Sequence, residues 1–332
     1  MISQEGDAFW KGRRVFVTGA TGIIGSRLVG SLLERQASVT ALVYEVDPRS
    51  DLYRSGDIDR VSAVHGELED YLTLAKALDE HRVETVFHLG AQPLVEVAHR
   101  LPLQTFEANI RGTYNLLEAC RRNSHFVRSV VIASSDKAYG ESDELPYTEE
   151  TPLNGRHPYE VSKSAADMLA QSYHHTFGLA VTIARCGNVY GPGDLNWSRL
   201  VPGTIRSFLR CERPVIRSDG GFVRDYVFVD DVVRSYLSLA EHAEEDGVRG
   251  EAFNFSAESP FAVVDVVGTL AQLLDCEHLE PDIRGTAQGE IRSQYLSSAK
   301  ARRVLGWQPR FTLAEGLRCT IPWYRELLGV PA

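Results

Sequence analysis

VFVTGATGIIG, residues 15–25, is the stretch that determines how this chain folds. An apolar, β-branched run enters a turn whose glycines are spaced G-x-x-G-x-x-G, and a helical pattern follows. The glycines permit a tight turn and let a pyrophosphate approach the backbone N–H groups, while the helix N-terminus favours negative charge. The spacing differs from the general G-x-G-x-x-G fingerprint, and a plain strand–turn–helix is the alternative. We predict dinucleotide binding by Gly19, Thr21, Gly22, Ile23, Ile24 and Gly25.

Strands and helices alternate outward from this turn. We expect strands at 14–18, 38–43, 61–64, 85–89, 129–133 and 180–184, and helices at 24–35, 71–81, 105–122 and 158–177. Nearly continuous apolar strands separated by helices predict a parallel sheet covered on both faces. The predicted fold class is α/β, with a Rossmann-type doubly wound parallel sheet and a smaller C-terminal α/β substrate-binding region.

The alternation becomes less regular after the turn Gly191-Pro192-Gly193. We expect a dinucleotide-binding domain at 1–190, to which 223–250 return. The substrate-binding region would then consist of 191–222 and 251–332.

Composition argues against several classes of protein. Lys and Arg number 35 and Asp and Glu 45, a formal charge of −10, which argues against nucleic acid or an anionic membrane as partner. The chain has no apolar run of the ~18 residues that span a membrane. Residues 1–10 are polar and acidic, unlike a signal peptide. Five scattered cysteines without C-x-x-C and histidines without metal-ligand spacing predict a cytoplasmic protein with reduced thiols and no metal.

YEVSK at residues 159–163 places Tyr159 and Lys163 on one face of a helix. A lysine ammonium beside a phenol stabilises phenolate, so we expect it to lower the pKa of Tyr159 from about 10. Such a tyrosine can take a proton from an alcohol whose carbon gives up hydride. Y-x-x-x-K occurs by chance in many helices, but downstream of the glycine turn it indicates a catalytic pair.

SSDKAYG at residues 134–140 follows the strand expected at 129–133. Ligands bind outside the carboxyl ends of parallel strands, so these side chains would line the cleft. We expect Ser135 to bind the reacting hydroxyl and Asp136 and Lys137 to supply an acid and a base. The alternative is a solvated loop with an incidental salt bridge.

The residues after the second strand favour NAD over NADP. Glu45 and Asp47 lie just beyond it, and two carboxylates would repel a 2′-phosphate; Arg49 is the nearest arginine. The alternative is that both are only loop residues. Glu67 is placed to contact adenine. Further expected cofactor contacts are Leu68, Leu89, Gly90 and Ala91.

Residues 10–324 resemble the extended short-chain dehydrogenase/reductase family. Within it, several stretches resemble the CDP-glucose 4,6-dehydratases: HLGAQPLV at 88–95, SDK at 135–137, RCGNVYG at 185–191, GD at 193–194 with SRLVP at 198–202, and LGWQP at 305–309. Sugar-nucleotide 4-epimerases share the glycine turn and Y-x-x-x-K but usually lack the acidic and basic pair after the serine or threonine.

The resemblance implies an NAD-dependent sugar-nucleotide 4,6-dehydratase, with CDP-D-glucose as the best single substrate. Tyr159, assisted by Lys163 and Ser135, would deprotonate the C4 hydroxyl while C4 gives hydride to NAD. Lys137 is then the candidate base at C5 and Asp136 the candidate acid for the departing C6 hydroxyl. Hydride return to C6 leaves a 4-keto-6-deoxyhexose.

The resemblance also implies contacts at the nucleotide end of the substrate. Asn188 matches the residue that contacts the diphosphate and Arg224 the arginine that pairs with a phosphate, which suits its forked guanidinium. Arg199 is a third candidate; surface or bridging arginines are the alternative. Residues 222–229 follow the general family pattern, so the base could also be uridine, guanosine or thymidine. Gln92, Leu200 and Val201 complete the expected substrate contacts.

Other interpretations stay open. The runner-up is a UDP-hexose type 4-epimerase, and a different class is a non-catalytic NAD(P)-sensing protein, against which the intact Ser135, Tyr159 and Lys163 argue. Helices around 103–120 and 159–177 would form a homodimer interface in this family, although their apolar residues could equally be core. We expect Asn109 to be architectural.

Overall fold

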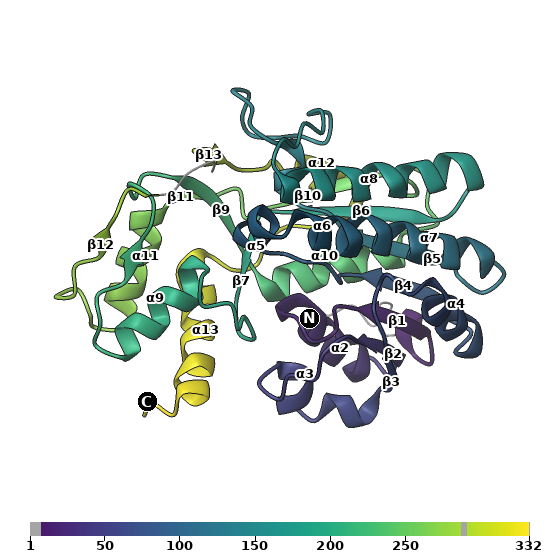
Figure 1. Ribbon diagram of the computed structural model, residues 1–332, viewed down its shortest axis with the longest axis horizontal. Coiled ribbons are helices and arrows are strands. Elements are labelled where there is room, and N and C mark those ends of the chain that lie inside the picture. The colour runs from purple at the N-terminus through teal and green to yellow at the C-terminus, as the bar shows by residue number, and fades with distance from the viewer. Residues whose placement is uncertain (1–7, 287–290, 332) are drawn as a thin grey trace.

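The computed structural model describes residues 8–286 and 291–331 (Figure 1), so most of the N-terminal segment discussed above lies outside the described residues. Its main feature is a parallel sheet in the order β10-β6-β5-β4-β1-β2-β3. The strands are β1 Arg14–Thr18, β2 Ser38–Val43, β3 Ser62–His65, β4 Thr85–His88, β5 Ser129–Ala133, β6 Val181–Cys186 and β10 Ala252–Phe255.

Helices cover both faces of this sheet. One face carries α2 (Ile23–Glu34) and α10 (Val229–Glu241), and the other carries α4 (Tyr71–Glu80), α7 (Gly112–Arg122) and α8 (Pro158–Phe177). Successive residues of a strand point to opposite faces. In β1 this places Val15 and Val17 in the core with α2 and α10, and Phe16 in the core with α4 and α7. The predicted doubly wound α/β fold is confirmed.

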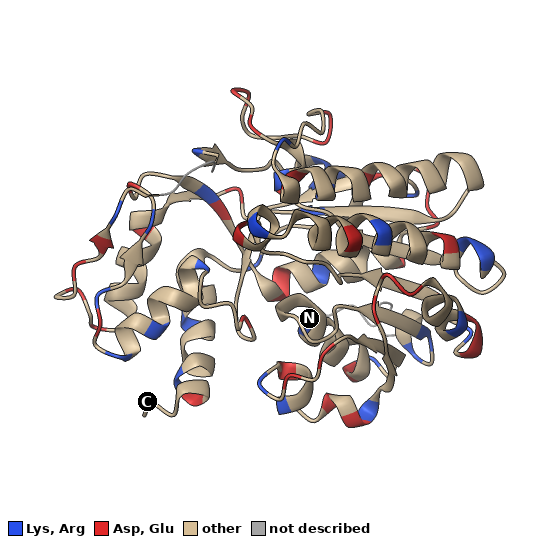
Figure 2. Cartoon of the chain, in the orientation of Figure 1, with Lys and Arg blue, Asp and Glu red and all other residues tan. Residues whose placement is uncertain are grey.

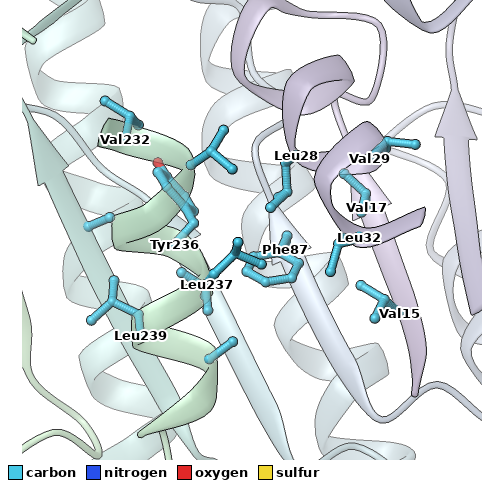
Figure 3. Close-up of a cluster of buried hydrophobic side chains, with 14 of the residues drawn as sticks. Val15, Val17, Leu28, Val29, Leu32, Phe87, Val232, Tyr236, Leu237 and Leu239 are labelled. Atoms are coloured by element: carbon cyan, nitrogen blue, oxygen red, sulfur yellow. The ribbon is translucent and has the colours of Figure 1, made fainter. Parts of the chain in front are cut away.

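Figure 3 shows the first of these two cores. Phe87 of β4 is fully buried and lies between Leu237 of α10 and Leu32 of α2. Burying a side chain of this size stabilises the fold by about 1.5–3 kcal/mol. The same packing fixes the two helices against the strands whose carboxyl ends carry the candidate site.

The strand order reverses between β1 and β4. The chain runs from β1 through β2 to β3 on one side, then crosses back to β4, which pairs with β1 in the register Thr18↔His88. In open parallel sheets, ligands bind at such a switch point, outside the carboxyl ends of the strands.

A second part of the chain lies beside the large sheet (Figure 1). Its small sheet has the order β11-β9-β13, with β7 also paired to β9, and β8 pairs with β12. The strands are β7 Asn188–Tyr190, β8 Val215–Ile216, β9 Val223–Phe228, β11 Pro260–Ala262, β12 Asp282–Ile283 and β13 Ser293–Gln294. The helices are α9 Leu200–Leu209, α11 Val263–Leu273 and α13 Leu313–Leu328, around their own apolar core.

Two strands do not lie in the sheet that the predicted domain division would assign to them. β9 begins the range expected to return to the first domain, yet it pairs within the small sheet. β10 lies in the range expected in the second region, yet it pairs with β6 in the large sheet. The chain therefore leaves the small sheet after β9, passes through α10 and enters the large sheet at β10.

The remaining elements are short. They are α3 Asp51–Arg54, α5 Val95–Arg100, α6 Pro102–Phe106, α12 Ala299–Leu305, the 3-10 turns η1 Asp57–Arg60 and η3 Asp136–Tyr139, and the π-helical η2 Glu107–Arg111. The helix expected at 105–122 is thus interrupted by a π-helical turn at 107–111. Such turns are common at functional sites, and this one carries Asn109.

Charged residues of both signs are interspersed along both parts of the chain (Figure 2). Within residues 8–286 and 291–331, no helix combines the length and apolar character needed to cross a membrane. The same residues contain no group of three His, Cys, Asp or Glu side chains placed to hold a metal ion.

Candidate active site

The glycine turn connects β1 to α2 beside the end of β4. Gly19 has φ +69°, and a Cβ there would lie 2.7 Å from the Gly90 nitrogen. A Cβ at Gly25 would collide with the carbonyl group of Gly19. These two glycines are therefore required by the packing of the chain against itself.

Gly22 differs from its two neighbours in the motif. It is exposed, and a Cβ would meet only the Gly19 oxygen, at 3.4 Å. It is also the N-cap of α2, which has no side-chain cap within the described residues. Room beside an uncapped helix N-terminus fits the pyrophosphate of a dinucleotide. The residues present at the switch point thus fit a bound dinucleotide.

Buried polar side chains join the ends of β1 and β4. Thr18 Oγ1 accepts a hydrogen bond from the Gly90 N–H at 2.9 Å and lies 2.9 Å from His88 Nδ1. His88 Nε2 lies 3.0 Å from Thr113 Oγ1. Burial, reinforced by the charge of Lys163, lowers the pKa of His88 to about 3. This histidine is neutral near pH 7. Its hydrogen bonds join β1, β4 and α7, and it does not exchange protons at that pH.

The residues expected to bind the adenosine half of the cofactor lie along the edge formed after β2 and β3. Glu45 and Glu67 are not buried. Asp47 accepts two hydrogen bonds from the Arg49 side chain and one from its backbone N–H, each of 3.0 Å, and these lower the pKa of Asp47. Arg49 thus partly offsets the charge of Asp47, and the contact of Glu45 with the cofactor stays a prediction.

The remaining expected cofactor contacts border the glycine turn. Leu68 lies against Gly90 and Gly112, where added Cβ atoms would meet its side chain at 3.1 Å and 2.6 Å. Leu89 and Ala91 flank Gly90 and are half-buried.

Ser135, Asp136 and Lys137 stand together at the carboxyl end of β5, where η3 begins. Ser135 Oγ donates to Asp136 Oδ1 at 3.0 Å and accepts from the Lys137 N–H at 3.2 Å. Asp136 is 2% exposed, and its Oδ2 has no hydrogen-bond partner in the described part of the chain. A buried carboxyl oxygen without a partner costs about 1–3 kcal/mol, which a bound hydroxyl would relieve.

Lys137 is held by a residue that the sequence did not indicate. Its Nζ donates to Gln294 Oε1 at 3.0 Å, and Gln294 Nε2 donates to the Asp136 carbonyl at 3.0 Å. Gln294 lies on β13 and is fully buried.

Tyr159 lies in the first turn of α8, beside this group, and is 8% exposed. Burial raises its pKa to about 12, while the charge of Arg199 and a hydrogen bond with Ser135 act in the opposite direction. The prediction that Lys163 lowers this pKa is wrong for this structure, because burial dominates. Lys163 Nζ donates instead to the Ala133 carbonyl at 2.9 Å, and burial lowers its own pKa to about 8.

A buried ion pair fixes α8 against the sheet. Arg185 of β6 donates to both carboxylate oxygens of Asp167, at 2.8 and 2.9 Å, and Ser134 Oγ donates to the same carboxylate at 2.7 Å. Arg185 also donates to the Tyr139 hydroxyl at 2.9 Å. This network joins β5, β6, α8 and η3, so it holds the loop of Ser135 against the helix of Tyr159.

Asn109 connects the loop after β4 to α8. Its Oδ1 accepts from the Gln92 N–H at 2.7 Å, and its Nδ2 donates to the Gln92 carbonyl at 3.0 Å and to Ser162 Oγ at 2.9 Å. The Gln92 side chain bonds within its own loop, to the N–H and carbonyl of Leu94. These contacts agree with the architectural role expected for Asn109.

The residues expected at the nucleotide end come from three elements. Asn188 is half-buried and begins β7, directly after β6. Arg224 is buried on β9, where its guanidinium donates to the carbonyls of Val223 and Arg292 at 2.9 and 3.1 Å. Arg199 is the N-cap of α9 and pairs with Asp194 at 3.1 Å.

The other expected substrate contacts begin α9. Leu200 is half-buried, whereas Val201 is buried in the core of the second part of the chain.

A second buried carboxyl lies near Asp136. Asp225 of β9 is fully buried, and its Oδ1 has no hydrogen-bond partner within the described residues. Burial raises its pKa to about 6, and the charge of Asp136 acts in the same direction. Asp225 was not predicted from the sequence, because only the folded chain brings β9 near Asp136.

The fold and this site define an enzyme of the short-chain dehydrogenase/reductase type: a dinucleotide turn at the switch point, with a buried tyrosine, a buried lysine and a half-buried serine beside it. Residues 15–255 match the model of the NAD dependent epimerase/dehydratase family. The chain belongs to this family, which identifies NAD as the cofactor class.

Similar proteins cover nearly the whole chain. A CDP-glucose 4,6-dehydratase of Salmonella typhimurium is 31% identical, over 96% of this chain and 92% of its own length. A UDP-glucose 4-epimerase structure from Thermotoga maritima, with UDP-glucose, superposes with a TM-score of 0.87 at 31% identity, covering 95% of this chain and 99% of its own. The dTDP-glucose 4,6-dehydratase DesIV of Streptomyces venezuelae, with NAD bound, gives 0.86 at 31% identity, covering 95% and 98%.

Proposed function

We propose that this chain is an NAD-dependent sugar-nucleotide 4,6-dehydratase and that CDP-D-glucose is its substrate. The observation that carries the proposal is the Asp136–Lys137 pair directly beside Ser135 and the buried phenol of Tyr159. An epimerase needs proton transfer only at the C4 alcohol, whereas dehydration also needs an acid at C6 and a base at C5. The CDP-glucose 4,6-dehydratase among the relatives supports the choice of nucleotide.

The first step is oxidation at C4. Gly22 and the first turn of α2 would bind the pyrophosphate of NAD, which when bound supplies the hydride acceptor and later the donor. Tyr159 would take the proton of the C4 hydroxyl as C4 loses hydride. Ser135 and the cationic Arg199 both favour the phenolate that this requires.

The second step is loss of water across C5 and C6. The C4 ketone acidifies the C5 proton, which Lys137 would remove as the neutral amine. Asp136 would donate a proton to the C6 hydroxyl, which leaves as water, and its unpartnered Oδ2 supports this role. Hydride would return to C6, and Lys137 would return its proton to C5. The proton taken by Tyr159 would pass to solvent and one would be regained by Asp136, which restores the starting state. The net change is loss of one water, with NAD regenerated.

The nucleotide end would be bound by the second part of the chain. Asn188 and Arg224 stand on the paired strands β7 and β9, in the register Asn188↔Tyr226, and would contact the diphosphate. Arg199 is half-buried, and its charge acts on Tyr159, so it would stand between phosphate and phenol. The proposed division assigns NAD to the large sheet and the sugar nucleotide to residues 191–222 and 251–332. Strands β7 and β9 contribute from outside these ranges, and β10 belongs to the large sheet.

Incubation with CDP-, UDP-, GDP- and dTDP-glucose in the presence of NAD tests the proposal. We expect CDP-glucose to give a product lighter by one water, with the ultraviolet absorbance of a 4-keto sugar in base. Loss of water from another nucleotide sugar would keep the reaction and change the substrate. A stable NAD complex without turnover of any of the four would favour the NAD(P)-sensing protein.

A 4-epimerase is the second candidate, because a UDP-glucose 4-epimerase is as similar in structure as DesIV. Its signature would be a product of unchanged mass with a new sugar. The carboxyl and amine beside Ser135 are the observation that favours dehydration over this outcome.

A homodimer and a cytoplasmic location complete the proposal. Leu103 of α6 and Met168 of α8 are 71% and 61% exposed, and Tyr114 of α7 is 40% exposed. Exposed apolar side chains on adjacent helices favour burial against a second copy. Light scattering during gel filtration would give the mass, expected at twice 36.9 kDa. Subcellular fractionation tests the location.

A further inference from the structure

Gln294 of β13 contacts both the candidate base and the backbone of the candidate acid. It is fully buried, and its side-chain amide makes two hydrogen bonds of 3.0 Å. Oε1 accepts from Lys137 Nζ, and Nε2 donates to the carbonyl of Asp136. Each amide atom meets the partner it requires, since an amine or ammonium N–H donates and a carbonyl only accepts. The orientation of the amide is therefore fixed by both partners together.

The backbone that carries Gln294 is held on both sides. Towards β9, β13 pairs in the register Ser293↔Val223 and Gln294↔Arg224, and the next residue but one, Leu296, donates its N–H to Asp225 at 3.4 Å. Towards the loop after η3, the Tyr147 N–H donates to the Tyr295 carbonyl at 2.9 Å. A side chain on a strand fixed from both sides keeps its atoms in place at little further entropic cost.

We propose that Gln294 is a positioning residue for dehydration. It acts through Lys137, whose flexible side chain it aims at C5, and through the backbone of Asp136. A lysine side chain is flexible and has many accessible rotamers, so a fixed acceptor for Nζ selects one direction out of many. The inference rests on the proposed function, because it assigns Gln294 to the elimination step of that reaction.

The register of β13 also connects this residue to the nucleotide end. Gln294 stands opposite Arg224, whose guanidinium donates to the Arg292 carbonyl, directly before β13. The group proposed to bind phosphate and the group that aims Lys137 are therefore neighbours on one pair of strands. Binding of the diphosphate by Arg224 would stabilise the strand whose Gln294 holds Lys137. Binding energy from the nucleotide end would then help to orient the base at C5.

Gln294→Met in the full-length enzyme with NAD is the central variant, because it keeps the volume and removes both hydrogen bonds. Two signals separate the steps: reduction of bound NAD, which follows oxidation at C4, and incorporation of deuterium at C5 from D2O. We expect kcat for dehydration and C5 exchange to fall about 100-fold, the effect of misplacing a reacting group by about 1 Å. KM and the rate of NAD reduction should stay within about threefold of wild type.

Gln294→Glu and Ser293→Ala serve as rescue and control. The substitution Gln294→Glu keeps an oxygen that accepts from Lys137 Nζ but places a carboxylate beside the amine, which favours the ammonium form. Its C5 exchange should therefore recover towards wild type as the pH rises, whereas the loss in Gln294→Met should not recover with pH. Ser293→Ala changes the preceding, half-buried residue of β13 and should behave as wild type. If Gln294→Met does not fold, the rates of NAD reduction and C5 exchange are compared with wild type in the Gln294→Glu and Gln294→Asn variants instead.

The outcomes are distinct. A wild-type enzyme that dehydrates, with a Gln294→Met variant of unchanged kcat and C5 exchange, overturns the inference alone. Equal losses of NAD reduction and C5 exchange also overturn it, because they indicate general damage to the site. A wild-type enzyme without dehydratase activity on any of the four nucleotide sugars overturns the proposed function, and this inference with it.

Discussion

Gly22→Ala should separate cofactor binding from folding. Gly22 has φ −78° and ψ 170°, a conformation that any residue adopts, and a Cβ there would meet only the Gly19 oxygen, at 3.4 Å. Alanine restricts the unfolded chain and so stabilises by about 0.4–1 kcal/mol. It is also a poorer N-cap than glycine, by about the same amount. The two effects offset each other, so we expect the Tm without NAD to change by less than about 2 °C.

The expected effect of Gly22→Ala on NAD binding is much larger. Under the proposed cofactor site, the added Cβ would stand where the pyrophosphate approaches the first turn of α2. A tenfold rise in Kd corresponds to about 1.4 kcal/mol. At NAD 100-fold above the wild-type Kd, binding stabilises the native state by about 2.7 kcal/mol, and a tenfold weaker variant by about 1.4 kcal/mol. Thermal unfolding with and without NAD should therefore show the NAD-induced rise in Tm reduced to about half.

Gly25→Ala is the matched control. Its Cβ would lie 2.7 Å from the carbonyl carbon of Gly19 and 2.9 Å from the Ala20 Cα, so the backbone must move. Overpacking of this kind costs about 1–3 kcal/mol, and the loss of stability should appear without NAD. A Gly22→Ala variant whose NAD-induced rise in Tm equals that of wild type would show that the pyrophosphate does not lie on this turn.

Three further variants test the proposed roles. Lys137→Met should leave NAD binding unchanged and slow deuterium exchange at C5 by about 100-fold or more; undiminished exchange would refute its role as base. Burial lowers the pKa of Lys163 to about 8, so the unfolded state binds more protons between pH 8 and about 10.4, and stability rises with pH there. Relative to Lys163→Met, wild type should gain about 2 kcal/mol in urea unfolding between pH ~7 and pH ~9.5, and a flat difference would show that Lys163 is not buried in this way. Arg185→Met leaves the buried Asp167 carboxylate unpaired and should cost about 3–5 kcal/mol in the same assay, whereas a change below about 1 kcal/mol would mean that the ion pair is hydrated.

The large sheet could be predicted because its signals are local. Strands such as β1 and β5 are short apolar runs bounded by turns, and their ends agree with the prediction. The sheet to which β9 and β10 each belong could not be predicted, because strand pairing depends on residues far away in the sequence. The π-helical turn η2 carries no local signal either, since its residues suit an α-helix equally well.

The candidate site likewise has a part that could be predicted from a local motif and a part that could not. Ser135, Asp136 and Lys137 stand in one short motif, so their position at a strand end followed from the pattern. Gln294 lies 158 residues from Asp136 in the sequence, and only the folded chain brings them together. The pKa of Tyr159 could not be predicted either, because it depends on how deeply the phenol is buried.

Under the proposed function, the two steps of the reaction depend on different parts of the structure. Tyr159 and Lys163 take their positions from α8 and from the Ala133 carbonyl of β5, all of which belong to the large sheet and its helices. Lys137 depends in addition on Gln294, from the small sheet. Oxidation at C4 therefore takes its acid–base side chains from the large sheet and its helices, with only the charge of Arg199 added from α9. Elimination needs, in addition, β13 in register beside Lys137. A dehydratase and an epimerase could then share the first step on the same fold and differ in whether the small sheet supplies an acceptor to the amine beside Ser135.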